Sequence, residues 1–360
     1  MVLGEPLKIN RPVDPELIMG TYEKMRIWKR WYPRLSMVSI EADLLDRPVE
    51  NSGKTCSFFS GGVDAFFTAL YYDKTTDPYA RIPIDDLVKV WGYDIPLQHV
   101  ESYVKLAAVL RVSSEEMGKE FVEMATNLRE TQLEKKADWG SFYVGSALGA
   151  AGLALEKRYK TVLISSGSDY RNVSPTGSSP LTDPLASTSR LRVRRAGGEF
   201  SRSQKTEYIA GFETVQRSLH VCFHMRSDKN CGRCLKCYRT MMTLEILGYL
   251  PLFKTLPAGA FELSKAAKMY LWEGDDELYT RDIERLVLKE RRTDVVAAAR
   301  ESLRHSRRLR RLLSLIEPLR HKKLFLRLFW VLEGKLLASS IGKEERYYPA
   351  TGNSMFVREA

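Results

Sequence analysis

Residues 54–70 read KTCSFFSGGVDAFFTAL and combine three local signals in one short stretch. Cys56–Phe59 is a short apolar run that favours a strand, and Ala65–Tyr72 is compatible with a helix. The turn between them, Ser60-Gly61-Gly62-Val63-Asp64, holds two glycines that can adopt positive φ and let a ligand approach the backbone. The order predicts a strand that leads through a tight turn into the N-terminus of a helix.

The same turn is a candidate anion site. Backbone N–H groups at a helix N-terminus, together with the positive end of the helix dipole, attract phosphate. Ser60 adds a hydroxyl donor, whereas Asp64 would repel phosphate unless it holds Mg²⁺ or caps a backbone N–H. A purely steric role is the alternative, because many strand-to-helix turns carry glycines without binding a ligand.

A second cluster of chemistry-bearing residues lies in the stretch CFHMRSDKNCGRCLKC, which holds four of the five cysteines: Cys222, Cys231, Cys234 and Cys237. The spacing C-x8-C-x2-C-x2-C aims four thiolates at one centre, and zinc prefers such a tetrahedral site. Two disulfides, a redox-active or persulfide-carrying C-x2-C pair and an iron–sulfur cluster are the alternatives. His220 and His224 flank Cys222 and could replace one sulfur, but we expect them outside the coordination shell. The fifth cysteine, Cys56, is expected in the core.

Composition narrows the class of protein. A chain of 360 residues with 44% hydrophobic residues can bury a sizeable core. It has no apolar run of about 18 residues and no signal-peptide pattern, so we expect a cytoplasmic protein that does not enter the membrane. The net charge of +11 is concentrated near the C-terminus, where residues 285–335 hold fifteen Lys or Arg against five Asp or Glu. A polyanionic partner would therefore be expected to meet this region.

The turn and the cysteines together carry a resemblance. SGGVD after a strand resembles the pyrophosphate loop SGGxD[ST] of the N-type ATP pyrophosphatases, or PP-loop superfamily. Cys231–Cys237 matches the run CGxCxxC of the 7-cyano-7-deazaguanine synthase family within it. Three further segments between residues 50 and 250 agree: Val88–Asp94 as the second strand, Val162–Ser166 leading into SSGSDY, and Gly197–Lys205, which reads GGEFSRSQK.

The resemblance implies an open, parallel five-stranded sheet with helices on both faces, ATP and Mg²⁺ at the carboxyl ends of its strands, and a structural Zn²⁺. It also implies a ligase that adenylates a carboxylate or amide and releases AMP and pyrophosphate. The nucleotide would be held by Ser60, Gly61, Gly62, Val63, Asp64, Thr68, Gly92, Tyr93 and Gly167. The implied catalytic residues are Asp64, Asp169, Arg202 and Lys205. A solvated basic face is the alternative for Arg202 and Lys205, and a plain turn aspartate is the alternative for Asp169.

The chain departs from the family pattern in ways that bear on its substrate. The family's hydroxyl after the loop aspartate is Ala65 here, and Thr68 is the nearest possible substitute. Residues 172–189 differ from the family's substrate loop, so the acceptor stays open between a deazapurine and another small acid or amide. Longer relatives are associated with prokaryotic antiviral defence. The alternative functions are a tRNA-modifying PP-loop enzyme and a catalytically weakened nucleotide-binding subunit of a defence complex.

We expect three regions. Residues 1–50 form an N-terminal extension with a helix at Pro15–Tyr32 and a strand at Leu35–Leu45. Residues 51–250 form the nucleotide domain, which ends in the zinc site. Residues 251–360 are helical, and between residues 303 and 319 leucines recur at helical spacing among arginines. These basic helices would hold RNA or an acidic protein, or would simply dock an apolar seam on the core or on a second protomer in a homodimer.

Overall fold

The computed structural model describes residues 1–46, 50–222, 228–271, 282–286, 292–320, 325–337 and 339–341. The chain divides into two compact units, one comprising Met1–Arg202 and the other beginning at Ser203. The cysteine cluster therefore belongs to the second unit. This division, which follows the packing of the chain, does not coincide with the domain boundaries expected at residues 50 and 250. Those boundaries stay predictions.

Five parallel strands form the main sheet of the first unit, in the order β5-β4-β3-β6-β7. Their bounds are Lys54–Phe58 for β3, Asp86–Trp91 for β4, Glu120–Ala125 for β5, Tyr159–Ser165 for β6 and Arg192–Ala196 for β7. From the central β3, the chain adds β4 and β5 on one side before it crosses to β6 and β7 on the other. Strands β4 and β6 are mostly apolar, because helices cover both faces of a parallel sheet. The predicted α/β class and five-stranded parallel sheet are confirmed.

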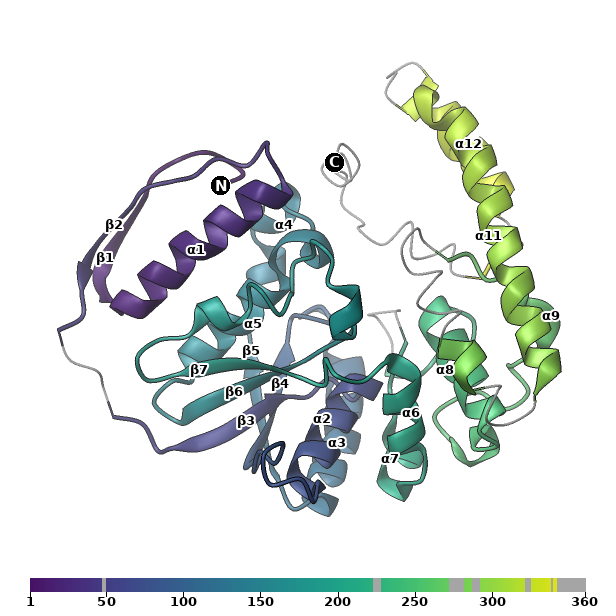
Figure 1. Ribbon diagram of the computed structural model, residues 1–360, viewed down its shortest axis with the longest axis horizontal. Coiled ribbons are helices and arrows are strands. Elements are labelled where there is room, and N and C mark those ends of the chain that lie inside the picture. The colour runs from purple at the N-terminus through teal and green to yellow at the C-terminus, as the bar shows by residue number, and fades with distance from the viewer. Residues whose placement is uncertain are drawn as a thin grey trace. The chain divides into compact units, whose positions relative to one another are not determined.

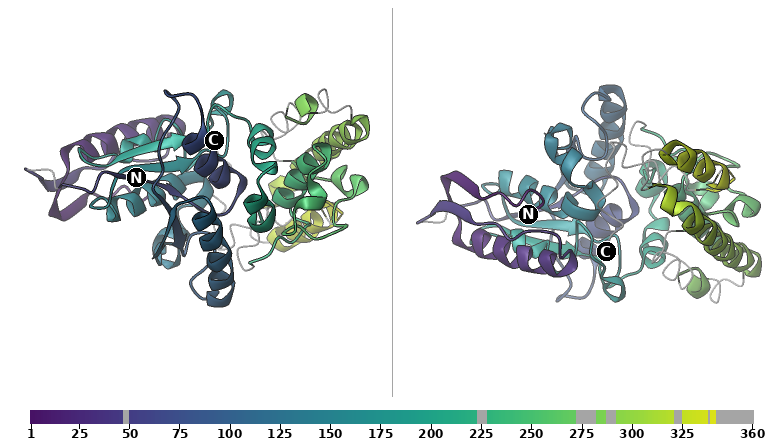
Figure 2. Two further views of the ribbon diagram at one scale, coloured as in Figure 1. Left: turned by 90° about the horizontal axis from the view of Figure 1, so that it is seen from below. Right: turned by 90° about the horizontal axis from the view of Figure 1, so that it is seen from above.

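Helices lie on both faces of this sheet (Figure 1). On one face are α2 (Val63–Lys74) and α3 (Val100–Glu116), and on the other are α1 (Pro15–Trp31), α4 (Gln132–Lys136) and α5 (Val144–Ala154). The core on the α1 side joins Trp28 and Phe142, whose ring centroids are 5.7 Å apart, to Phe58, Val90 and Ile164 of the strands. The same layers can be followed from below and from above in Figure 2.

The N-terminal segment forms a small sheet of its own. Strands β1 (Leu7–Val13) and β2 (Ile40–Leu44) pair in parallel and do not extend the main sheet. The predicted helix is confirmed as α1, which begins where Asp14 accepts a hydrogen bond from the Glu16 N–H at 2.9 Å. The predicted strand is shorter than expected. The strand β1 was not predicted, because the alternation of Leu7 and Ile9 with polar residues is short and ends at Arg11, and the strand stays largely exposed.

The described elements of the second unit are helices. They include α6 (Arg202–Ala210, whose first residue ends the first unit), α7 (Glu213–Ser218), α8 (Leu235–Ile246), α9 (Leu263–Ala266), α11 (Thr293–Arg320) and α12 (Leu326–Leu337). As expected, leucines of α11 form an apolar seam, in which Leu309 and Leu313 pack with Tyr270 and Leu337. Among the described residues, no helix is long and apolar enough to cross a membrane.

Candidate functional site

The glycine turn lies between β3 and α2, as the sequence predicts. Gly61 has a φ of +82°, and a Cβ added there would lie 2.7 Å from Cδ2 of Leu110, so the turn needs glycine for both backbone and space. Gly62 is the extended N-cap of α2 and offers no capping side chain. The Ser60 hydroxyl accepts a hydrogen bond from the Gly62 N–H at 3.3 Å. The N-terminus of α2 thus has the backbone arrangement that binds anions.

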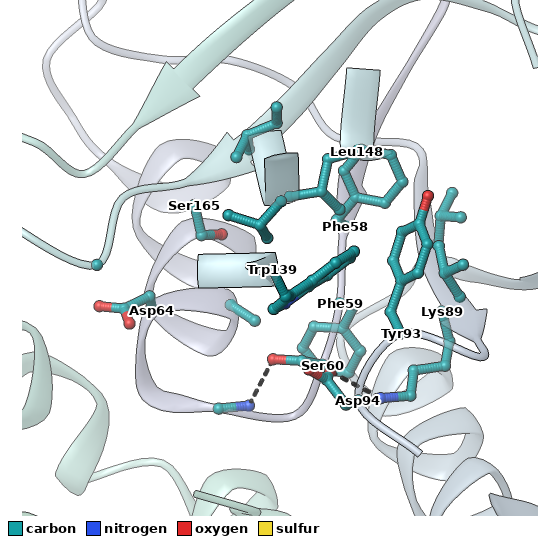
Figure 3. Close-up of a pocket in the computed structure, with 17 residues that line it drawn as sticks. Phe58, Phe59, Ser60, Asp64, Lys89, Tyr93, Asp94, Trp139, Leu148 and Ser165 are labelled. Atoms are coloured by element: carbon teal, nitrogen blue, oxygen red, sulfur yellow. Dashed lines mark hydrogen bonds and ion pairs between the residues drawn. The ribbon is translucent and has the colours of Figure 1, made fainter. Parts of the chain in front are cut away.

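A cavity of about 230 Å³ opens at the carboxyl ends of β3, β4 and β6 (Figure 3). Between β3 and β6 the chain reverses the direction in which it adds strands, and α/β sheets bind ligands at such switch points. The turn supplies one part of the wall, and aromatic and aliphatic side chains supply another, among them Phe58, Tyr93, Trp139 and Leu148. The cavity therefore combines an anion-binding turn with an apolar surface suited to a planar ring.

Two predicted catalytic residues form an ion pair beside the turn. The guanidinium of Arg202 donates to the carboxylate of Asp64, and both side chains are partly buried. Asp64 belongs to the first turn of α2 and also lines the cavity. A carboxylate that would repel a phosphate therefore stands here with its charge offset by an arginine.

Three further residues predicted to hold the nucleotide separate into lining and structural positions. Tyr93 and Gly167 line the cavity. The Tyr93 hydroxyl donates to the carbonyl of Ala147 at 2.6 Å, and burial raises the pKa of Tyr93 to about 12, so it stays a neutral donor. Gly92 has a φ of +97°, and a Cβ there would lie 1.9 Å from the carbonyl oxygen of Thr126. Close packing of two loops therefore explains Gly92 without a ligand.

Other predicted residues lie outside the cavity wall. Asp169 caps a short 3₁₀ turn (η3, Tyr170–Asn172), where it accepts from the Arg171 N–H at 3.0 Å, as a plain turn aspartate would. Thr68 and Val63 are fully buried in α2 and do not line the cavity. Lys205 is only 1% exposed in α6, so the interpretation as a solvated basic face is wrong for this residue.

The four predicted metal ligands do come together. The Sγ atoms of Cys222, Cys231, Cys234 and Cys237 lie within 4.8 Å of one another. Those of Cys231 and Cys237 are 3.9 Å apart, close to the ~3.8 Å that Zn–S bonds of about 2.3 Å give in a tetrahedron. Hydrogen bonds with the other three sulfurs, and one from the Arg233 N–H, lower the pKa of Cys231 and favour the thiolate. The cluster could bind zinc; His224 lies outside the described residues.

One residue that sequence reasoning missed positions this cluster. Asn230 is 4% exposed, and its side-chain oxygen accepts from the N–H groups of Val221 and Cys222 at 2.8 and 3.1 Å. Its amide group donates to the carbonyls of Leu219 and Thr255. A buried, fully bonded asparagine thus fixes the segment that carries the first ligand. An asparagine beside a cysteine knuckle is a weak signal in a sequence, because asparagine is common in turns.

A buried ion pair anchors the loop of residues 172–189. Asp183 accepts from Arg195 of β7 at 2.8 Å and from the Ser178 hydroxyl at 2.6 Å, while Arg195 also donates to the Ser166 hydroxyl at 2.7 Å. The side chains of Arg195 and Asp183 are 5% and 0% exposed. The loop of residues 172–189 is therefore anchored to the sheet. No local signal marks the pair, because Asp183 lies in the loop and Arg195 in the strand that follows it.

The segment Gly197–Lys205 is tied to α2 by another contact missed in the sequence. The Tyr72 hydroxyl donates to Glu199 and accepts from the Gly197 N–H at 2.6 Å. Phe200 packs on Phe67 with ring centroids 4.9 Å apart. These contacts explain how Arg202 reaches Asp64.

Comparison of the chain with protein-family models, with curated proteins and with solved structures gave no match.

Proposed function

We propose that the protein cleaves ATP between the α- and β-phosphates and transfers AMP to a carboxylate or amide oxygen of a small acceptor. The supporting observation is the Gly61–Gly62 turn, which ends the central strand at the switch point and opens into the cavity beside Asp64. An anion-binding helix N-terminus with a carboxylate in its first turn suits a nucleotide and its metal ion.

The residues around the turn have distinct tasks in this reaction. The N–H groups at the start of α2 and the Ser60 hydroxyl hold the β- and γ-phosphates, which leave as pyrophosphate. Asp64 would hold Mg²⁺, which offsets the charge of the leaving group when it is bound. Arg202, once released from Asp64, can neutralise charge on the reacting phosphate.

The reaction takes place beside the apolar wall of the cavity. The acceptor oxygen forms a bond to the α-phosphorus as the α–β P–O bond breaks, giving an adenylate and pyrophosphate. Ammonia or another nucleophile then displaces AMP. Phe58, Tyr93 and Trp139 shield the cavity from water, which would otherwise hydrolyse the adenylate.

Product analysis tests this proposal. The purified protein is incubated with ATP, Mg²⁺ and candidate acids, and we expect AMP and pyrophosphate in equal amounts. Asp64→Asn should lower the rate at least about 100-fold, as for loss of a transition-state contact, while Asp43→Asn, an exposed change on β2, should not alter it. Release of ADP and phosphate instead would contradict the proposal.

Ala65 favours a second candidate, a nucleotide-binding subunit with weakened turnover. Ala65 lines the cavity. It puts a methyl group where the family that the sequence resembles has a phosphate-binding hydroxyl. On this candidate, Ala65→Ser raises the rate of AMP formation from a low value. An unchanged rate in that variant would argue that the turn works without the hydroxyl.

A further inference from the structure

Lys89 is a buried cation in the wall of the cavity. It sits on β4 within the otherwise apolar run LVKVW, and the whole residue is 2% exposed. Its neighbours along the wall include Val88, Val90 and Phe59. An ammonium group taken out of water is costly unless other groups compensate for its lost hydration.

The compensation that the protein itself provides is weak. Lys89 Nζ lies 3.6 Å from Oδ2 of Asp94, and the Asp94 side chain is 58% exposed (Figure 3). A charge-assisted hydrogen bond between such groups is normally about 2.7–2.9 Å long. Burial lowers the pKa of Lys89 below its usual range, although Asp94 counteracts this shift. Asp94 therefore offsets only part of the cost of burying the cation.

A second buried lysine, Lys119, directly before β5 of the same sheet, shows what a purely structural role looks like. Lys119 is 6% exposed, donates to the carbonyl of Ile84 at 2.8 Å and pairs with Asp73 at 3.1 Å. Lys119 is thus held by a backbone carbonyl and a close carboxylate, and it does not line the cavity. Lys89 has neither a short contact nor a carbonyl partner among the described residues, and it faces a space that a ligand could fill.

We propose that Lys89 binds an oxyanion of the ligand in this cavity and exchanges Asp94 for it. The oxyanion is the α-phosphate of a nucleotide whose β- and γ-phosphates occupy the turn, or the carboxylate of the acceptor. Ser60 and Gly62 of the turn line the same cavity as Lys89, and β4 pairs directly with β3. The choice of these two oxyanions rests on the proposed function, whereas the exchange itself rests on the geometry of Lys89 and Asp94.

Two variants with opposite effects test the exchange. Dissociation constants are measured for AMP, adenosine, pyrophosphate and benzoate with the full chain. Lys89→Met should weaken AMP binding by about 10- to 100-fold, the value of a lost hydrogen bond to a charged group, and leave adenosine and pyrophosphate within about twofold. Asp94→Asn removes the competing carboxylate and should tighten AMP binding by up to about fivefold. Lys119→Met is the matched control and should lower the melting temperature without changing any dissociation constant.

The arms of the experiment separate the two oxyanions. If the carboxylate is the partner, Lys89→Met weakens benzoate and leaves AMP unchanged. The inference is overturned if Lys89→Met changes neither ligand, if Asp94→Asn fails to tighten the one that Lys89 binds, or if the wild-type protein binds none of the four probes. If only the proposed function fails, AMP or benzoate still binds in a Lys89-dependent manner, but no pyrophosphate forms from ATP.

Discussion

At the scale of single residues, Gly61 shows how backbone and packing requirements coincide at one position. We expect Gly61→Ala to destabilise the protein more than Gly53→Ala, by about 1–3 kcal/mol, the usual cost of overpacking. Both glycines have positive φ, +82° and +78°, so both variants carry the same backbone strain. Only at Gly61 does the added methyl meet a neighbour, Leu110.

Urea unfolding of the two variants measures this difference. Gly61→Ala combined with Leu110→Val should recover part of the loss, because the smaller side chain makes room. Equal destabilisation by Gly61→Ala and Gly53→Ala would show that Leu110 moves aside freely.

Asp86 provides a pH-dependent prediction at the same scale. It is 1% exposed, and although burial raises its pKa, hydrogen bonds from Tyr159 and Arg158 and a contact with Lys54 bring the pKa below its usual range. A pKa that is lowered in the folded state stabilises the protein at pH values above the unfolded pKa of about 3.9. This stabilisation is lost as the pH falls through the folded pKa. We expect Asp86→Asn to cost about 1–3 kcal/mol at pH 7, since Lys54 and Arg158 are each more than a third exposed and can rehydrate.

Unfolding free energies at several pH values check this expectation. The gap between wild type and Asp86→Asn should narrow as the pH falls below about 4. Asp43→Asn, the exposed control, should follow the wild type throughout. A gap that is independent of pH would assign the effect to packing rather than to charge.

At the scale of elements, the buried ion pair of Asp183 and Arg195 joins the loop of residues 172–189 to β7. Removing one member of a buried ion pair typically costs about 3–5 kcal/mol, because the other charge is left buried. We therefore expect Arg195→Ala to destabilise the first unit by about this amount and to expose the loop to proteases. The control is Arg194→Ala, a change at the preceding, exposed position of β7, which should do neither. Limited proteolysis with mass mapping measures both, and cleavage of the two variants at the same rate would contradict the anchoring role.

The cysteine cluster is the second feature at this scale. We expect one zinc per chain by metal analysis, lost in Cys234→Ser and retained in Cys56→Ala. Chelation should lower the melting temperature, because metal binding stabilises the folded state by linkage. Cys234 and Cys237 are both buried, so an unmetallated cluster would leave thiols packed against each other. Iron with visible absorbance, or an intramolecular disulfide, would contradict the zinc assignment.

At the scale of the whole molecule, the net charge of +11 leads to a prediction about binding partners. Arg307 and Arg308 are exposed on α11. We expect the chain to bind single-stranded RNA without sequence preference, and Arg307→Gln with Arg308→Gln should reduce the slope of log affinity against log salt by about 1.4, at about 0.7 per charge. The same pair of changes at Arg26 and Arg30 of α1 serves as the control. An unchanged slope in the α11 variant would favour an α11 that only docks its leucine seam.

How far the sequence predicted this structure depends on the range of each interaction. The strand, turn and helix around Gly61 follow from neighbouring residues, and the cysteines converge because their spacing is short. The five parallel strands were expected, whereas their order was not predicted from the sequence. The strand β1 and the role of Gly92 could not be predicted this way, since exposure decides the first and loop packing decides the second.

By itself, the sequence determined the glycine turn and the cysteine cluster, because local propensity and short spacing suffice for both. The α/β layering was expected only from the resemblance, since it depends on pairing between strands that are far apart in the chain. Only the tertiary structure decided that Arg202 meets Asp64, that Arg195 meets Asp183 and that Lys89 is buried beside Asp94 in the cavity. The first two pairs bring together residues from different elements of the fold. For Lys89, the sequence of a strand does not show whether its lysine faces water or a cavity. Burial is a property of the packed layers, and it turns an ordinary strand lysine into a candidate ligand-binding residue.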